Sequence, residues 1–173
     1  MNKIIKENGI QFGIIIGIIS ILLPAATYIS DKPLYKNVYI GLLSYSIYWV
    51  IRIYQAKKTK TELQSQTVTL KEIFTTLLIS TTIGIIISTL FNYLFYNFFA
   101  IDLMHETNEF MNLKQLEIQK VFNKGGFDKR KIMELNNFSL EILLKNGVVS
   151  ILISSIFNLI LAAIFKSKTS NQL

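Results

Sequence analysis

The sequence predicts an all-α integral membrane protein, a four-helix bundle with an extramembrane amphipathic helical segment between helices 3 and 4. Of its 173 residues, 51% are hydrophobic and only 17% are charged, whereas about 25% are charged in an ordinary soluble domain. Four stretches carry no charge, and a water-soluble domain of this size could not bury all of them. Basic residues gather near the ends of these stretches, as membrane topology requires. The uncharged stretches are 8–30, 37–51, 73–101 and 146–165.

The first predicted span covers 8–30, because a helix needs about 20 residues to cross the hydrocarbon of a bilayer. Lys3 and Lys6 before it, and the small residues around Pro24 within it, also resemble a signal peptide. The uncharged run is longer than the apolar core of such a peptide, which has about 7–15 residues, so we expect the helix to be retained. The second span is predicted at 37–56, with Arg52 reaching toward the lipid headgroups.

The third span, 73–101, would be roughly 43 Å long as a single helix, which exceeds the hydrocarbon thickness. We therefore expect it to tilt, or its aromatic last turns to emerge at the membrane interface. Thr69 and Glu72 form a T-x-x-E capping box that predicts where this helix begins. The fourth span, 146–165, has the length of a membrane crossing.

The distribution of lysine and arginine predicts the orientation. The short connection 52–72 is the most basic one, whereas 102–145 is long and balanced in charge. Basic short connections stay in the cytoplasm, so both termini are predicted to be cytoplasmic. The excess of lysine over arginine suggests an AT-rich bacterial genome, which places the multi-pass chain in the bacterial cytoplasmic (inner) membrane. This distribution also explains the net charge of +7, so the predicted partner is the lipid bilayer and no nucleic acid.

Small residues recur every four positions on three of the predicted helices. Lipid provides no hydrophobic drive for helix association, so close backbone approach at such positions supplies it. The pattern predicts helix packing but leaves open whether it occurs within one chain, in a homo-oligomer or with a membrane protein partner. The predicted helix-packing residues are Gly9, Gly13 and Gly17, then Ser80, Gly84 and Ser88, then Ser150, Ser154, Asn158 and Ala162.

Asn158 is one of the two deepest strongly polar side chains, the other being Asn92. An unsatisfied amide in hydrocarbon costs several kcal/mol, so Asn158 should face protein or water. At a rise of 1.5 Å per residue it lies roughly 4 Å to the cytoplasmic side of the midplane, at the depth of Ser80 and Thr81. We predict a hydrogen bond from Asn158 to a neighbour near these two residues.

The extramembrane segment, 102–145, is predicted to begin with an amphipathic helix. Gly125 and Gly126 should break it, and Asp128 is placed to cap a second helix that runs to Lys145 and on into the fourth span. The pattern does not decide between a position on the membrane surface and one in solvent. The apolar face of the first helix consists of Leu103, Met104, Phe110, Met111, Ile118, Val121 and Phe122.

One group of residues has the composition of a metal site. Asp102, His105, Glu106 and Glu109 share one helical face, and such ligands suit a divalent cation. One helix supplies only part of a ligand shell, so we favour a solvated polar face and predict no metal, no cofactor and no catalytic residue. The sequence thus predicts a non-enzymatic protein that acts through helix–helix contacts. The alternative is a small oligomeric channel or transporter lined by Asn92, Asn158 and nearby hydroxyl groups.

Four helix-end segments carry a family resemblance: Arg52-Ile53-Tyr54, Val68-Thr69-Leu70, 97–102 and 158–166. With them, nearly the whole chain resembles a bacterial family of small four-span membrane proteins, the domain of unknown function forty-one ninety-nine. A glycine that is frequent in the family near Lys71 is absent here. The family has no established activity and implies no site residues. Its genes often neighbour a glycosyltransferase gene, which implies an accessory or scaffold subunit of an envelope-biosynthesis system.

Overall fold

A computed structural model describes residues 2–63, 67–122 and 129–167. Every regular element in these residues is a helix. The chain forms two compact units, with residues 1–88 and 147–173 in unit 1 and residues 89–146 in unit 2. The elements are α1 (Lys3–Ser30), η1 (Leu34–Lys36), α2 (Val38–Leu63), α3 (Leu70–Leu94), η2 (Phe95–Phe99), α4 (Ile101–Phe122), α5 (Lys129–Met133) and α6 (Leu140–Phe165).

Three stretches of helix in the described residues are long and apolar enough to cross a membrane. They are α1, the continuous stretch Leu70–Phe99 that combines α3 with η2, and α6. The protein is therefore helical with three candidate membrane spans. The predicted second span, 37–56, which falls largely in α2, is not among these three, because Arg52, Gln55 and several tyrosines lower its mean hydropathy.

The ends of two helices follow local rules. The Asn2 side chain caps α1 by accepting a hydrogen bond from the Ile4 amide, at 2.9 Å. The predicted capping box before α3 is confirmed: the Thr69 amide donates to the Glu72 carboxylate at 2.8 Å, and the Glu72 amide donates to the Thr69 hydroxyl at 3.3 Å. These bonds fix the start of α3 at Leu70.

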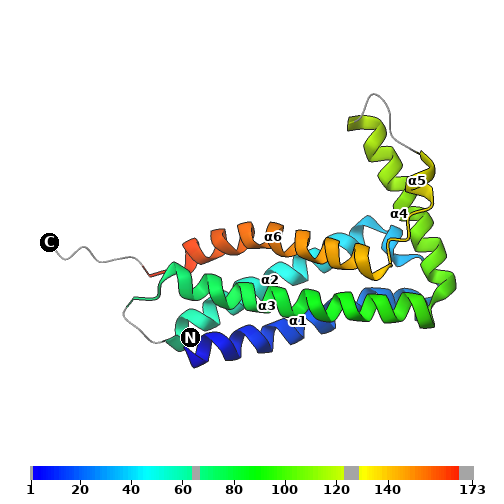
Figure 1. Ribbon diagram of the computed structural model, residues 1–173. Coiled ribbons are helices and arrows are strands. Elements are labelled where there is room, and N and C mark those ends of the chain that lie inside the picture. The colour runs from blue at the N-terminus through cyan, green and yellow to red at the C-terminus, as the bar shows by residue number, and fades with distance from the viewer. Residues whose placement is uncertain (1, 64–66, 123–128, 168–173) are drawn as a thin grey trace. The chain divides into compact units, whose positions relative to one another are not determined.

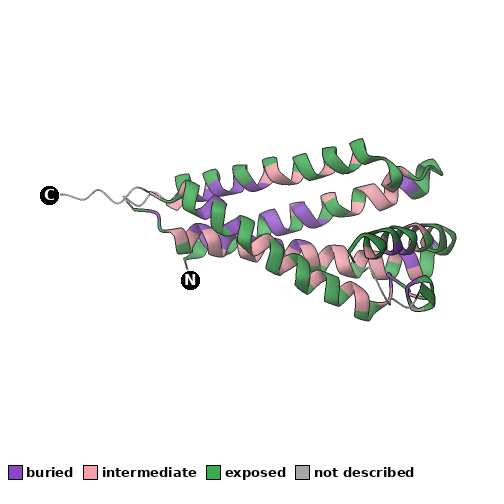
Figure 2. Ribbon diagram, turned by 90° about the horizontal axis from the view of Figure 1, so that it is seen from above, coloured by how far each residue is buried: buried purple, intermediate pink, exposed green. Residues whose placement is uncertain are grey.

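In unit 1, α1, α2, α3 and α6 lie alongside one another (Figure 1). Their buried residues lie on the faces that the helices turn toward each other, and the outer faces are exposed (Figure 2). The apolar part of this interior is a cluster shared by α2, α3 and α6. It contains Ala56, Val68, Ile73, Leu77, Leu161 and Ala162.

Glycines bring α1 and α3 together. A Cβ atom added at Gly9 or Gly13 would lie 2.7 Å from Ile79 or Ile83 of α3. In the other direction, one added at Gly84 would lie 2.7 Å from Ile16 of α1. The isoleucine side chains of each helix thus occupy the space that the glycines of the other helix leave free.

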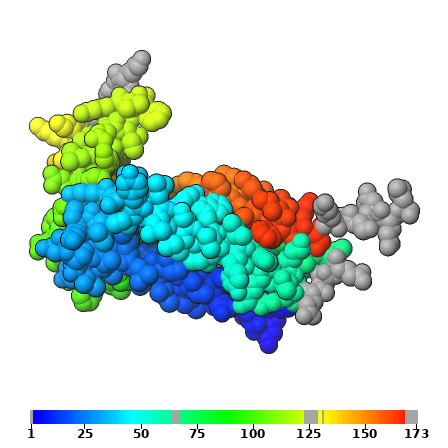
Figure 3. All heavy atoms as spheres, turned by 180° about the vertical axis from the view of Figure 1, so that it is seen from behind, coloured from blue at the N-terminus to red at the C-terminus, as the bar shows by residue number. Residues whose placement is uncertain are grey.

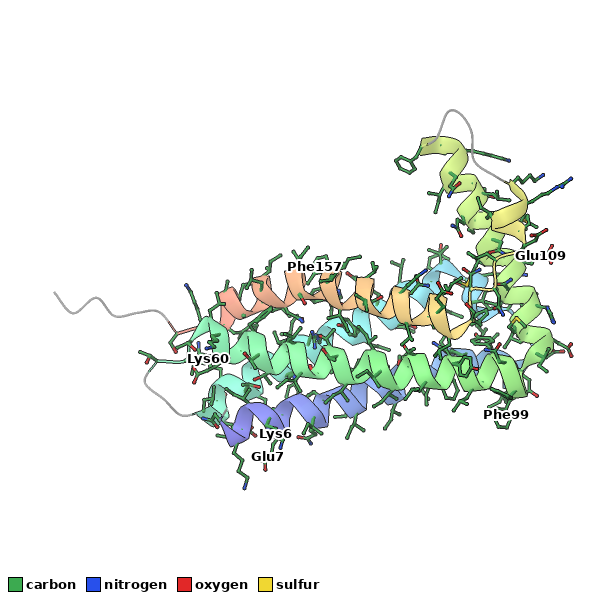
Figure 4. All side chains as sticks on the ribbon, in the orientation of Figure 1. Lys6, Glu7, Lys60, Phe99, Glu109 and Phe157 are labelled. Carbon is green, nitrogen blue, oxygen red and sulfur yellow. The ribbon has the colours of Figure 1, made fainter. Side chains whose placement is uncertain are left out.

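Four chain segments meet at one end of unit 1. The Ser167 amide, just beyond α6, donates to the Val68 carbonyl at 2.8 Å, and the Val68 amide donates to the Ser167 hydroxyl at 2.9 Å. The side-chain amide of Asn8 on α1 donates to the Glu62 carboxylate of α2 at 2.7 Å. Lys6 and Lys60 lie at this end in Figure 4. The start of α1, the end of α2, the start of α3 and the end of α6 therefore share one end of the bundle.

Unit 2 begins with the last turns of α3 and the π-helical turn η2. Asn97 in this turn donates to the Phe138 carbonyl at 2.9 Å, and the ring centroids of Tyr96 and Phe138 are 4.0 Å apart. A second anchor joins α4 to the segment after α5. There the Asn137 amide group donates to the side-chain oxygens of Asn108 and Asn112, at 2.8 and 2.7 Å.

The predicted second helix is not continuous between Asp128 and Lys145, although its predicted run from Lys145 into the fourth span is confirmed, because α6 contains both. Helix α5 ends at Met133, and α6 begins anew at Leu140, with the Ser139 hydroxyl accepting from the Ile142 amide at 3.4 Å. The asparagine bonds to α4 hold the intervening segment in a non-helical conformation. Gly125, Gly126 and Asp128, which were predicted to break and cap helices, lie outside the described residues.

The predicted apolar face of α4 is covered only in part, with Leu103, Met104 and Phe110 half-buried. The buried residues of α4 are Thr107, Asn112 and Leu116. Ile118, Val121 and Phe122 at its C-terminal end are exposed. Asparagine hydrogen bonds, which apolar periodicity does not reveal, decide this packing.

Candidate functional site

The interior of unit 1 contains a buried arginine. Arg52 of α2 is only 1% exposed, so the prediction that it reaches toward the lipid headgroups is wrong. Its side chain instead turns toward α3 and α6, where backbone and side-chain acceptors are available. A cation that finds several acceptors inside the bundle has no need to extend to the headgroups.

The Arg52 guanidinium group bonds to two helices at once. Its Nη1 donates to the Leu77 carbonyl at 2.9 Å and to the Ser80 hydroxyl at 2.7 Å, both on α3. Its Nη2 donates to the Thr81 hydroxyl of α3 and to Oδ1 of Asn158 on α6. The guanidinium carbon also lies 5.4 Å from the centre of the Tyr48 ring, within cation–π range.

Further polar groups hold these acceptors in place. Gln55 accepts from the Ser80 hydroxyl at 2.9 Å and donates to the Thr76 carbonyl at 3.3 Å. Asn158 donates to the Thr81 hydroxyl at 3.1 Å. The hydrogen bond predicted for Asn158 from its depth in the membrane is therefore present. Arg52 donates to both residues of this bond, Thr81 and Asn158.

The charge of Arg52 is stabilised by neutral groups. Four ion pairs of the described residues join a lysine to a glutamate one helical turn away: Lys3–Glu7, Lys58–Glu62, Lys114–Glu117 and Lys145–Glu141. None of them involves Arg52. A buried charge without a counter-ion carries a large desolvation cost, which carbonyl, hydroxyl and aromatic groups offset only in part.

Two hollows adjoin this polar centre. A cavity of about 260 Å³ lies between α1, α2 and α3 and reaches Tyr48 and Thr81. A smaller one, of about 130 Å³, lies between α2 and α6 and reaches Arg52 and Asn158. The polar centre thus borders space that a ligand could enter.

The residues predicted to pack helices lie in different environments in the structure. Gly9, Gly13, Gly17 and Gly84 lie between α1 and α3. Ser80 and Asn158 belong to the Arg52 network, and Ala162 is part of the apolar cluster. The remaining serines line hollows or face outward: Ser88 borders the larger cavity, Ser154 borders the smaller one, and Ser150 is exposed.

The residues of the candidate metal site lie on an exposed face of α4. Asp102, His105, Glu106 and Glu109 are exposed, and Glu109 projects from α4 in Figure 4. The described residues contain no group of three or more metal-ligating side chains placed to hold an ion.

The sequence contains a pattern that predicts the buried arginine and its network, but an argument from span length alone does not consider it. Arg52, Gln55 and Thr59 recur at spacings of three and four, which places them on one face of α2, and all three are buried. A polar stripe on a largely apolar helix, together with the hydroxyls of Ser80 and Thr81 on another helix, predicts an internal network.

Comparison with known proteins gives a family and no individual relative. No curated protein matches the chain. No solved structure matches it. The family model described as protein of unknown function (DUF4199) matches residues 11–167, which is most of the chain. This protein therefore belongs to the DUF4199 family.

Proposed function

We propose that the chain is a four-span protein of the bacterial cytoplasmic membrane, with α2 as the fourth span. The polar residues of α2, including Arg52 and Gln55, are buried against α3 and α6. Its opposite face carries exposed apolar side chains such as Leu42, Val50 and Ile53. A helix with this arrangement suits lipid even though its average hydropathy is low, because the bundle covers its polar groups.

The orientation with both termini in the cytoplasm rests on charge and on the shared end of the bundle. Lys3, Lys6, Lys57, Lys60 and Lys71 lie in or beside the segments that meet at that end. Four crossings return the chain to the side where it began. Positively charged short connections favour the cytoplasmic side.

We further propose that the protein is a non-enzymatic accessory or scaffold subunit that acts through helix–helix contacts. The observation that supports this is that the helices of unit 1 are locked to one another. Glycines interlock α1 with α3, and Arg52 joins α2 to α3 and α6. A locked bundle suits a static subunit better than a transporter whose halves rock against each other. Its exposed apolar faces remain for lipid and for a partner.

Site-specific photocrosslinking tests the scaffold proposal. A photoreactive phenylalanine analogue is placed singly at exposed apolar positions on different helices: Ile14, Ile18, Leu42, Val50, Leu152 and Ile156. We expect positions one or two turns apart on one helix face to give a single discrete adduct in cells, while lipid-facing positions give none. If no position on any of these faces forms a protein adduct, the proposal is wrong.

The alternative function, a small channel or transporter, is favoured by one observation. The larger cavity is bordered by the hydroxyls of Ser20, Ser44, Thr81 and Ser88. Asn158→Leu separates the two proposals, because it removes an acceptor from Arg52 and a donor from Thr81. We expect it to lower the free energy of unfolding in detergent by about 1–3 kcal/mol. A variant with wild-type stability that abolishes a measured chloride or phosphate flux into liposomes would instead support transport.

A further inference from the structure

The hollow between α2 and α6 is a groove with a polar floor. Arg52 and Asn158 form the polar part of it, and its volume of about 130 Å³ is small. Figure 3 shows α2 (cyan) and α6 (orange to red) side by side on one face of the molecule. The groove is lined by Tyr45, Tyr48, Trp49 and Arg52 from α2 and by Ile153, Ser154, Phe157 and Asn158 from α6.

The walls of the groove are aromatic and apolar. The rings of Trp49 and Phe157 meet edge to face across it, with centroids 5.4 Å apart. Tyr45, Ile153 and Phe157 are 54, 52 and 40% exposed, and Phe157 lies on the outer side of α6 in Figure 4. The groove therefore has an apolar mouth and a cationic floor, which is the complement of an amphipathic anion.

Within the described part of the chain, Arg52 has an unused hydrogen-bond donor and an unbalanced positive charge with which to bind such a ligand. Four of its five N–H groups bond to neutral acceptors. In the described residues the Nε–H group has no acceptor, and no carboxylate neutralises the positive charge. An anion would supply the missing charge through a charge-assisted hydrogen bond, which is about twice as strong as a neutral one.

We propose that this groove binds a membrane phospholipid of net negative charge by its phosphate. The inference rests on the proposed fourth span, which places the mouth of the groove against the bilayer. A dissolved anion would have to leave water and cross hydrocarbon to reach Arg52, at a large solvation cost. A lipid phosphate arrives laterally instead, and an arginine within a span thins the bilayer locally so that headgroups approach it.

The size of the groove agrees with this occupant. Pockets that enclose drug-sized ligands measure about 300–1,000 Å³, so this groove takes a headgroup and leaves the acyl chains outside. Those chains would lie along the exposed apolar residues at the mouth, including Ile153 and Phe157. Ser154, which borders the groove, supplies a hydroxyl near the headgroup.

The one tryptophan of the chain reports on binding, because Trp49 lines the groove. The full-length protein in a non-ionic detergent is titrated with phosphatidylglycerol or phosphatidylcholine that carries brominated acyl chains, and quenching of Trp49 fluorescence is followed. We expect phosphatidylglycerol to half-quench at a concentration about tenfold lower, because the phosphate of phosphatidylcholine is already balanced by its own choline cation, whereas that of phosphatidylglycerol is not.

Two serine-to-leucine variants provide the matched comparison. Ser154→Leu fills the groove without altering Arg52, and we expect it to abolish the preference for phosphatidylglycerol. Ser46→Leu on the exposed side of α2 should leave it unchanged. Arg52→Gln should also abolish it, and Ser154→Leu keeps the test decisive if Arg52→Gln does not fold.

Three results would overturn the proposal. They are equal quenching by both lipids, a Ser154→Leu variant that retains the preference, and competition by inorganic phosphate alone, which would indicate a free-anion site. Failure of the photocrosslinking test would leave this result untouched, because lipid binding needs no protein partner. If α2 does not cross the membrane, a separate experiment, the labelling of cysteines placed at the two ends of α2, would show it.

Discussion

At the scale of single residues, Arg52 decides how three helices are joined. Its planar guanidinium group presents N–H groups in a fixed fork, so one side chain reaches Leu77 and Ser80 on α3 and Asn158 on α6. Each acceptor comes from a different turn or helix. Lysine, with a compact ammonium group, lacks this geometry. The bundle therefore depends on arginine at this position and not simply on a positive charge.

Substitution of Arg52 tests this dependence. We expect Arg52→Ala to lower the free energy of unfolding by roughly 2–4 kcal/mol, because it leaves a cavity and removes four hydrogen bonds. Arg52→Lys should recover less than half of that loss. Unfolding in detergent, followed by circular dichroism, measures both. Lys57→Ala, an exposed site on the same helix, is the control. Equal stability of Arg52→Ala and Lys57→Ala would contradict the role given to Arg52.

At the scale of elements, the sequence predicted those features that depend on residues close together in the chain. The Thr69–Glu72 capping box places the start of α3 to within a few residues, and the charge-free runs locate α1, α3 and α6. The interrupted segment between α5 and α6 was missed, because its conformation depends on Asn112 and Asn137, which lie far apart in sequence. Arg52 was misplaced for the same reason: its partners Ser80 and Asn158 belong to other helices.

The packing of α1 on α3 depends on glycine where the helices approach most closely. We expect Gly13→Ala to destabilise the protein by about 1–3 kcal/mol, as overpacking does. Its Cβ would lie 2.7 Å from Ile83 Cβ and 3.1 Å from the Ser80 carbonyl, so the helices would have to move apart.

Gly41→Ala on α2 is the matched control for this substitution. A Cβ at Gly41 meets no atom within 4 Å. Alanine should therefore stabilise that helix by about 0.5 kcal/mol through its helix propensity. Thermal unfolding in detergent should show shifts of opposite sign for the two glycine variants. A shift of the same size and sign in both would mean that propensity, and not close packing, governs Gly13.

At the scale of the whole molecule, composition and structure give different kinds of support for the assignment of membrane spans. Hydropathy identifies three candidate spans. Whether α2 suits lipid as the proposed fourth span depends on which of its faces the bundle covers. Mean hydropathy does not show this, because it averages over the polar and the apolar face. The buried polar stripe of α2 lowers its hydropathy, yet it is this stripe that bonds to α3 and α6. A span whose polar groups are satisfied by its neighbours remains compatible with lipid.

Labelling of cysteines tests this topology, because the natural chain has none. Lys36→Cys lies before α2 and Lys57→Cys near its other end, roughly 30 Å along a helix. Both lysines are exposed. If α2 crosses the membrane and the termini are cytoplasmic, an impermeant thiol reagent applied to intact cells should label position 36 only. Position 57 should react after the cells are permeabilised, and the cysteine-free chain should never react. Labelling of both positions from outside would remove α2 as a span, and labelling of position 57 alone would invert the orientation.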